Sequence, residues 1–230
     1  MHEQKAHEPH KKGNKLSDVI LGGQDGLVNV LGLLLGLAAA TSSVRVILAG
    51  GLAATFAETL SMAAVAYTSK MADKDYYETE RAREYQEIKD IPEIETQEIR
   101  DIYIAKGFEG ELLEDIVKHI TSDDDRWVDN MMRDELDLIS VDVHDIHIYS
   151  FTVGLSTLVG SVLPLLPFFF LGVHPALVIA ILISIASLAG VGLYKAHTTL
   201  AKPAKSALQM IVIGMGAAIA GYLIGLVFKK

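Results

Sequence analysis

Long apolar runs alternate with a single long polar stretch along this chain. Four runs carry no Asp, Glu, Lys or Arg, or only one acid, and each is long enough to cross about 30 Å of hydrocarbon as a helix. They are residues 46–67, 148–173, 176–194 and 207–228, and a fifth run, 19–40, qualifies if one Asp is tolerated. The pattern predicts an all-α, polytopic membrane protein with five transmembrane helices.

The polar stretch, residues 73–145, lies between the second and third runs. It holds 24 of the 29 acidic residues against nine Lys and Arg. Apolar residues recur in it at helical spacing, so we expect a small helical domain rather than a disordered acidic tail.

Helix boundaries within this stretch follow from its proline, glycine and capping residues. The second transmembrane helix should continue to about Lys89, and Pro92 fits the first turn of the next helix. Gly107 and Gly110 should break that helix. Ser122 or Asp123 could then cap a further helix that contains Trp127.

Lysines set the expected topology by the positive-inside rule. They precede the first helix and lie between the fourth and fifth, as Lys11, Lys12, Lys15, Lys195, Lys202 and Lys205. The N-terminus and the acidic domain are therefore expected to be cytoplasmic. The predicted organisation is a flexible tail over 1–15, transmembrane helices one and two over 16–70, a cytoplasmic helical metal-binding domain over 71–147, and helices three to five over 148–230.

Helix one carries small and polar residues at alternating steps of four and three, which places them on one face. They are Asp18, Gly22, Asp25, Asn29, Gly32 and Gly36. Glycines alone would indicate a helix-packing seam. An acid within a span costs about 2.5 to 3.5 kcal/mol and generally faces a protein interior or an aqueous path, so we interpret Asp25 as functional and Asp18 as a second candidate near the interface.

Helix two repeats this pattern with Gly51, Thr55, Glu58, Met62 and Ser69 on roughly one face. Glu58 and Met62 are one turn apart. A membrane Met is usually apolar filling, but a thioether beside a carboxylate also forms a soft-plus-hard ligand pair for a transition metal.

Three clusters in the acidic domain place metal-ligating side chains within one helical turn. They are Glu84 with Glu87, Glu95 with Glu98, and Met131 and Met132 with Glu135. A solvated helix face is the alternative for any one pair. Like charges at this spacing repel, so three such clusters favour neutralisation by bound cations.

Histidines and small residues elsewhere are weaker candidates. His2, His7 and His10 in the tail could collect metal, and His144 and His147 could bind metal or simply be interfacial. Pro164 and Pro167 should kink helix three. A small-residue seam is expected on helix five, at Gly214, Ala218, Gly221 and Gly225.

Taken together, several short segments resemble the vacuolar iron transporter family over about residues 16–228. The resemblance is carried by Asp18-Val-Ile-Leu-Gly-Gly-Gln-Asp25-Gly-Leu, Ser61-Met62, Arg83-Glu84-Tyr-Gln-Glu87-Ile, Pro92-x-x-Glu95-x-x-Glu98-Ile and Met131-Met132-Arg-Asp-Glu135-Leu. The order of these segments and their placement relative to five predicted spans make the match specific.

The resemblance implies a homodimer with a divalent-metal path along its two-fold axis and a cytoplasmic domain that gathers iron. Asp18, Asp25 and Met62 fall on pore-lining positions of the family. The cytoplasmic metal site would comprise Glu84, Glu87, Glu95, Glu98, Met131, Met132 and Glu135. Plant-like members carry a helix-two carboxylate where this chain has Ala54, and here the acid appears one turn later, as Glu58.

We therefore expect a transporter rather than an enzyme, which exchanges protons for cytoplasmic Fe²⁺, with Mn²⁺ as a second candidate substrate. The expected path is lined by Asp18, Asp25, Asn29, Glu58 and Met62. Its expected partners are a second copy, the lipid bilayer and divalent ions, with no prosthetic group and no nucleic acid. The short chain fits a prokaryotic plasma membrane better than a vacuolar membrane.

Two other functions use similar residues. A membrane-anchored di-iron oxidase of ferritin-like type requires a Glu-x-x-His motif on each of two helices, and the acidic stretch contains none. A membrane-anchored metal sensor or buffer would leave the intramembrane acids Asp25 and Glu58 without a role.

Overall fold

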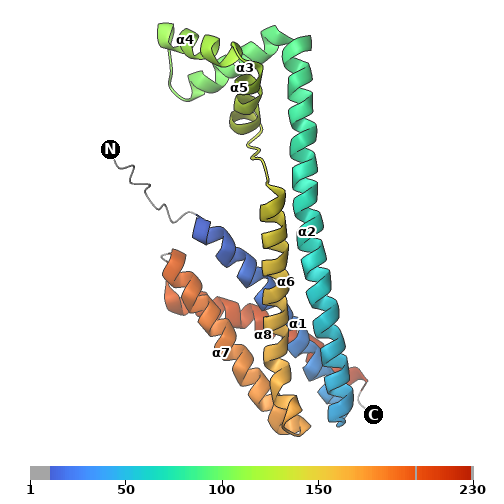
Figure 1. The fold of residues 1–230 in the computed structure, drawn as a ribbon. Helices are drawn as coiled ribbons and strands as arrows, with labels where there is room; N and C mark the ends of the chain where they lie inside the picture. Colours follow the sequence, from blue (N-terminus) through green and yellow to red (C-terminus); the bar gives the residue numbers. More distant parts are fainter. Residues whose placement is uncertain (1–10, 200, 229–230) are drawn as a thin grey trace, which may run out of the picture. The chain divides into compact units, whose positions relative to one another are not determined.

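The structure, a computed structural model, describes residues 11–199 and 201–228, with side chains described from residue 16 onwards. Every regular element in these ranges is a helix (Figure 1). In chain order the elements are α1 (Lys11–Ala40), α2 (Val44–Asp90), α3 (Pro92–Ala105), α4 (Gly110–Thr121), α5 (Asp124–Asn130), η1 (Met131–Glu135), α6 (Val143–Leu165), η2 (Leu166–Phe169), α7 (Val173–Thr199) and α8 (Pro203–Val227).

Five helical segments within the described residues are long and apolar enough to cross a membrane, which confirms the predicted all-α, five-span class. They are Leu16–Ala40, Val44–Asp90, Val143–Phe169, Val173–Thr199 and Pro203–Val227. The second is much longer than a bilayer requires, because 47 residues at about 1.5 Å each extend far beyond a hydrocarbon core of roughly 30 Å. Its C-terminal part is therefore not a membrane span.

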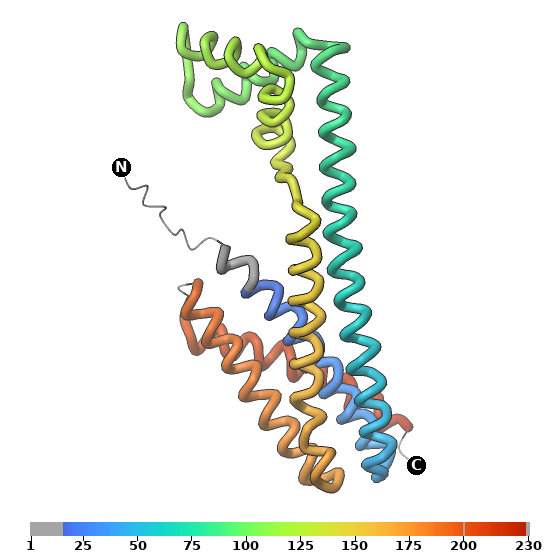
Figure 2. Tube along the Cα trace, viewed as in Figure 1, coloured from blue at the N-terminus to red at the C-terminus, as the bar shows by residue number. Residues whose placement is uncertain are grey.

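The chain divides into two compact units. The first, here called the membrane unit, comprises Met1–Tyr67 and His147–Lys230. The second, the helical unit, comprises Thr68–Ile146. Helix α2 contributes residues to both units, and its continuous trace is visible in Figure 2.

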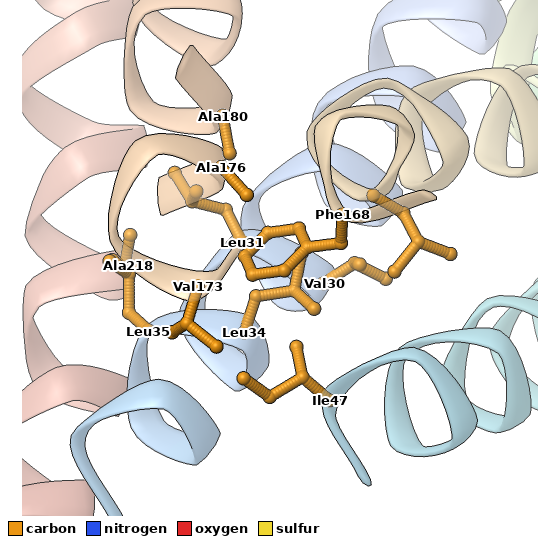
Figure 3. Close-up of a cluster of buried hydrophobic side chains, with 11 residues drawn as sticks. Val30, Leu31, Leu34, Leu35, Ile47, Phe168, Val173, Ala176, Ala180 and Ala218 are labelled. Atoms are coloured by element: carbon orange, nitrogen blue, oxygen red, sulfur yellow. The ribbon is translucent and has the colours of Figure 1, made fainter. Parts of the chain in front are cut away.

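The membrane unit has a buried core of Leu, Val and Ala side chains from α1, α7 and α8, closed by residues of α2 and η2. Figure 3 shows Leu31, Leu34 and Phe168 within this cluster. Large apolar side chains also cover its outside: Phe56 of α2 is 60% exposed and Phe151 of α6 is 70% exposed. Such an exterior suits lipid rather than water.

Glycines bring α1 and α8 into backbone contact, and the two helices lie side by side (Figures 1 and 2). A Cβ added to Gly221 would lie 2.5 Å from the Gly32 carbonyl oxygen, and one added to Gly225 would lie 2.2 Å from that of Gly36. The predicted small-residue seam on the fifth span is therefore confirmed. The facing residues on α1 are Gly32 and Gly36, which belong to the row of small and polar residues predicted on one face of that helix.

Two predicted boundaries differ from the structure. Helix α6 ends at Leu165 and continues only as the short 3₁₀ segment η2 to Phe169, so Pro167 ends the α-helix rather than kinking a helix that runs to residue 173. Proline has no N–H for the α-helical hydrogen bond, and its ring clashes with the carbonyl one turn back, so the α-helical pattern stops here. At the other end of the chain, α1 begins at Lys11, within the predicted tail, while residues 1–10, with His2, His7 and His10, lie outside those described.

The helical unit matches the predicted boundaries closely. Helix α2 ends at Asp90, Pro92 begins α3, and the Asp123 side chain caps α5 by accepting a hydrogen bond from the Arg126 N–H at 2.9 Å. Gly107, in the loop after α3, and Gly110, the first residue of α4, adopt positive φ angles of 90° and 63°, a conformation that glycine tolerates best. Trp127 packs in the apolar core of this unit.

Candidate metal-binding sites

An acid–amide pair joins α1 and α2 inside the membrane unit. The Asn29 side-chain amide donates a hydrogen bond to the Glu58 carboxylate. Asp25, one turn before Asn29, interacts electrostatically with the same carboxylate, and the buried Ser161 of α6 is a further neighbour. Thus the structure brings together three residues that the sequence placed on two separate helix faces.

Glycines on α1 allow α6 to approach this group closely. A Cβ on Gly22 would lie 2.3 Å from the Val153 carbonyl oxygen, and one on Gly26 would lie 2.4 Å from that of Thr157 and 2.5 Å from Ser161 Oγ. Any larger residue at either glycine would push α6 away. The sequence pattern missed Ser161, because a lone hydroxyl in an apolar helix normally bonds its own backbone.

An open cavity of about 490 Å³ between α1 and α8 adjoins Asp25 and Asn29. Its polar lining comes from α1, at Ser17, Gln24, Asp25 and Asn29, and α8 contributes apolar and small residues. Oxygen-bearing side chains thus line one wall of a space that is large enough for a hydrated ion. Ser17 and Gln24 were not among the predicted path residues. Each directly precedes an Asp in the sequence, Asp18 and Asp25, so the two residues share the same seven-residue spacing on α1.

The other two predicted path residues lie on the same helices. Asp18 is half-buried on α1, seven residues before Asp25, and has interaction partners of its own. Met62 is half-buried on α2, one turn after Glu58. The four-residue spacing holds Met62 on the Glu58 side of the helix.

A second acidic group lies in the helical unit and consists of the five predicted glutamates, here called the carboxylate set. Glu84 and Glu87 come from α2, Glu95 and Glu98 from α3, and Glu135 from η1. Glu84 and Glu95 are buried, with only 2% and 3% exposed, whereas Glu135 is exposed. Each of the two buried side chains has an Oε2 atom that accepts no hydrogen bond from any described residue.

Burial and mutual repulsion change the acidity of this set. Burial raises the pKa of Glu84 to about 7, and the charges of Glu135 and Glu87 add to the rise. Burial likewise raises the pKa of Glu95 to about 7, with further contributions from Glu98 and Glu84. The pKa of Glu135 is also raised, first by partial desolvation of its carboxylate and then by the charges of Glu98 and Glu87. Residues far apart in the sequence therefore act as one coupled acidic group.

Arg83 is a cation that lies against this set. Its guanidinium is 2.9 Å from Glu80, 3.9 Å from Glu84 and 3.6 Å from Glu87. Glu80 is itself buried, with 8% exposed, but was not among the predicted ligands. The i, i+4, i+7 spacing of Glu80, Glu84 and Glu87 could have indicated it, because these positions share one helix face.

Met131 and Met132 are fully buried in the apolar core of the helical unit, packed with residues such as Ile99 and Trp127. They open the five-residue π-helix η1, in which the Leu136 N–H bonds to the Met131 carbonyl at 3.2 Å. π-Turns are rare and are frequent at functional sites. This turn gives the chain from Met131 to Glu135 a wider spacing than the α-helical turn expected from sequence.

The candidate ligands of both sites are farther apart than the ligands of a closed metal site. Among the residues that the structure describes, no three His, Asp or Glu side chains form a group that could hold a metal ion as they stand. At the start of α6, the His147 ring stacks on Tyr67 at a centroid distance of 5.6 Å. The backbone N–H of His144 donates a hydrogen bond to the Asp142 carboxylate at 2.7 Å, which leaves the His144 ring out of this contact.

These features define an integral, multi-pass membrane protein that carries carboxylates within its spans and an acid-rich helical unit between the second and third spans. Residues 16–226 match the VIT family. The chain belongs to the VIT family.

Similar proteins match this chain over most of their length. Vacuolar iron transporter 1 of Arabidopsis thaliana is 31% identical over 218 residues, which cover 94% of this chain and 87% of the relative. Vacuolar iron transporter 2 of Oryza sativa subsp. japonica is 32% identical over 211 residues, covering 91% and 86%. The vacuolar iron transporter of Plasmodium falciparum is 28% identical over 227 residues, covering 94% and 83%.

Proposed function

We propose that this protein is a transporter that moves Fe²⁺ out of the cytoplasm in exchange for protons, with Mn²⁺ as a second substrate. The relatives that it matches are named as iron transporters. The observation that carries the proposal is the group formed by Asp25, Asn29 and Glu58 inside the membrane unit. Two neighbouring acids are costly in a bilayer, and a divalent cation would offset that cost.

Hard oxygen ligands and one thioether would form the path. Asp25 and Glu58 supply carboxylates, Asn29 an amide oxygen, and Met62 a sulfur one turn away. Carboxylates favour divalent cations, and the softer sulfur favours a transition metal over Mg²⁺. Asp18 and the open cavity beside Asp25 would continue the path along α1.

Exchange with protons follows from the same pair of acids. Two carboxylates close together in a low-dielectric span are neutralised either by a divalent cation or by protons, so binding of one favours release of the other. Moving a divalent cation outwards against an inside-negative potential costs roughly 4.6 kcal/mol per 100 mV. Export therefore needs a driving ion, and protons are the counter-ions that these acids can accept.

The carboxylate set of the helical unit would collect the metal before transport. Its buried, mutually repelling carboxylates gain most from a divalent cation, which would draw them into a closed ligand sphere. A negative surface also raises the local cation concentration and the rate of capture. Met131 and Met132 would bias the choice of metal if η1 turns either sulfur towards the set.

The proposed assembly is a homodimer in a prokaryotic plasma membrane, with the N-terminus and the acidic domain on the cytoplasmic side. The lysines in the first residues of α1 and around the junction of α7 and α8 support this orientation. The open cavity on the α1–α8 face supports a path that a second copy would complete. The two-fold symmetry of the homodimer would double the number of acids that face the ion.

Metal flux into liposomes that contain the purified protein tests this function. Mn²⁺ and Fe²⁺ uptake should require an imposed pH gradient and should fail for Asp25→Asn and Glu58→Gln, which keep the side-chain size but remove the charge. Glu114→Gln, on an exposed residue paired with Arg100, is the matched control and should transport normally. Wild-type flux at full rate in Asp25→Asn would refute the path, and oxygen consumption on addition of Fe²⁺ without flux would favour an oxidase.

A further inference from the structure

Arg83 contacts carboxylates inside and outside the carboxylate set at the same time. Its Nη2 atom lies 2.9 Å from Glu80 Oε2 and 3.9 Å from Glu84 Oε1, and its Nε lies 3.6 Å from Glu87 Oε2. The Arg83 charge also acts on Glu135, on the neighbouring π-turn. One guanidinium thus lies within 4 Å of three acids and acts electrostatically on a fourth.

Burial distinguishes these contacts from an ordinary ion pair on a helix surface. Exposed pairs at this spacing contribute little. Here the side chains of Glu80 and Glu84 are only 11% and 3% exposed, while that of Arg83 is 53% exposed. The two acids are therefore held within the unit, and the half-exposed cation reaches them from the water side.

The distances also rank the partners. The contact with Glu80 is the shortest of the three, and the charge of Glu80 is the main cause that raises the pKa of Arg83. The contacts with Glu84 and Glu87 are longer and purely electrostatic. Arg83 therefore has a strong partner outside the set and two weak partners within it.

We propose that Arg83 is the built-in counter-cation of the carboxylate set, and that Glu80 holds it in place when a divalent ion displaces it from Glu84 and Glu87. The inference rests on the proposed metal-binding role of the set. In this arrangement Arg83 is a positioning residue. Before metal binds, Arg83 reduces the repulsion between the acids. It also opposes metal binding, because the guanidinium and the divalent ion then compete for the same carboxylate oxygens.

Arginine suits this task because its guanidinium stays protonated at all relevant pH values. It weakens the site by a constant amount and so favours release of the ion to a later site. Glu80 limits that effect, since it offers the guanidinium a better partner than the ligands. Without Glu80, Arg83 would bind Glu84 and Glu87 more tightly and exclude metal more strongly.

Mn²⁺ titration of the full-length protein by calorimetry tests the inference, with every variant in an Asp25→Asn background to remove an intramembrane acid from the measurement. Arg83→Gln should bind Mn²⁺ about tenfold more tightly, as expected from relief of repulsion between a guanidinium and a divalent ion about 5 Å apart in a watery environment. Glu80→Gln should bind several-fold more weakly. Arg100→Gln, which breaks a 3.1 Å pair with Glu114 in the same unit, should change nothing.

The double variant Glu80→Gln, Arg83→Gln separates this mechanism from simple charge removal. If Glu80 acts through Arg83, its loss should matter much less once Arg83 is absent, whereas a bulk charge effect would be the same in both backgrounds. Metal-free Arg83→Gln should also unfold at a lower temperature than the wild type, and Mn²⁺ should restore it. Unchanged or weaker Mn²⁺ binding by Arg83→Gln overturns the inference alone, while an absence of Mn²⁺ binding in the parent protein overturns the proposed capture site as well.

Discussion

Glu84 of α2 and Glu95 of α3 lie on either side of the turn at Pro92, and the pKa of Glu95 is raised first by burial and then by the charges of Glu98 and Glu84. Both side chains are buried, with 2% and 3% exposed, and both have a pKa of about 7. The turn between α2 and α3 thus creates a pair of acids that titrate at neutral pH, far above the usual range of a glutamate.

Mn²⁺ binding to the carboxylate set should release about one proton per ion at pH 7, because two groups with a pKa near 7 are each about half protonated there. Affinity should rise between pH 6 and pH 8. Calorimetric titration in buffers of different ionisation enthalpy measures the protons released. In the variant Glu84→Gln, Glu95→Gln, most of the buffer dependence should disappear, and a full proton release in that variant would contradict the assignment.

The thermal stability of the metal-free protein should fall as pH rises from the ordinary glutamate value of 4.5 to about 7 and should level off above pH 7. A carboxyl group whose pKa is raised on folding stabilises the folded state at low pH, and this contribution is lost as pH rises through the folded-state pKa, here about 7. Saturating Mn²⁺ should remove most of the decline. A melting temperature that rises steadily from pH 6 to pH 8 without metal would contradict the burial of these two acids.

Asn29→Ala should slow Mn²⁺ transport by about tenfold or more, because a hydrogen bond to a charged group contributes about 1.5 to 3 kcal/mol and Glu58 would lose its amide donor. Metal binding by the helical unit should be unaffected. Thr59→Val is the matched control on α2, since its hydroxyl only bonds back to the Thr55 carbonyl at 2.7 Å. Equal rates for the two variants would show that the Asn29 contact has no part in transport.

Gly225→Ala should destabilise the membrane unit by about 1 to 3 kcal/mol, because the new methyl group would collide with backbone rather than with a movable side chain. Gly216→Ala on the same helix meets nothing within 4 Å and should be neutral or slightly stabilising. Unfolding of the purified protein in detergent, followed by temperature, distinguishes the two. Similar melting temperatures would mean that α8 can move away from α1 at little cost.

Met132→Leu tests whether the buried sulfurs bind metal. The swap keeps the volume of a fully buried side chain, so it should cost less than about 1.5 kcal/mol of stability. If the thioether is a ligand, the affinity for Co²⁺ should fall several-fold relative to Mn²⁺, which depends less on soft donors. An unchanged ratio would make Met132 a core residue only.

Local rules were sufficient for much of this fold. Hydropathy located the five spans, Pro92 marked the start of α3, and the Asp123 cap began α5, because each depends on neighbouring residues in the sequence. The π-turn after Met131 could not be found in this way, since its wider spacing is not set by any short sequence signal. Ending α6 at Pro167 was also missed, because a proline can either kink or stop a helix.

The candidate sites show the same division. A carboxylate is unusual in an otherwise apolar span, so Asp25 and Glu58 could be identified as candidates from the sequence alone. Ser161, a neighbour of Glu58, did not, because it reaches the site through the close approach of α6 to Gly26. Glu80 was hidden among many acids, and only its burial beside Arg83 separates it from a solvated charge.

The glycine seam gives α1 and α8 a contact made of main chain, which cannot be repacked by changing rotamers. At Asn29 and Glu58, by contrast, α1 meets α2 through flexible side chains. We therefore expect α1 and α8 to travel as one rigid body and α2 to change its distance from them during turnover. Because the chain contains no cysteine, two introduced cysteines with spin labels would report this directly: the separation of labels at Leu33 and Ile213 should stay fixed, and that of labels at Leu33 and Leu60 should vary with bound Mn²⁺.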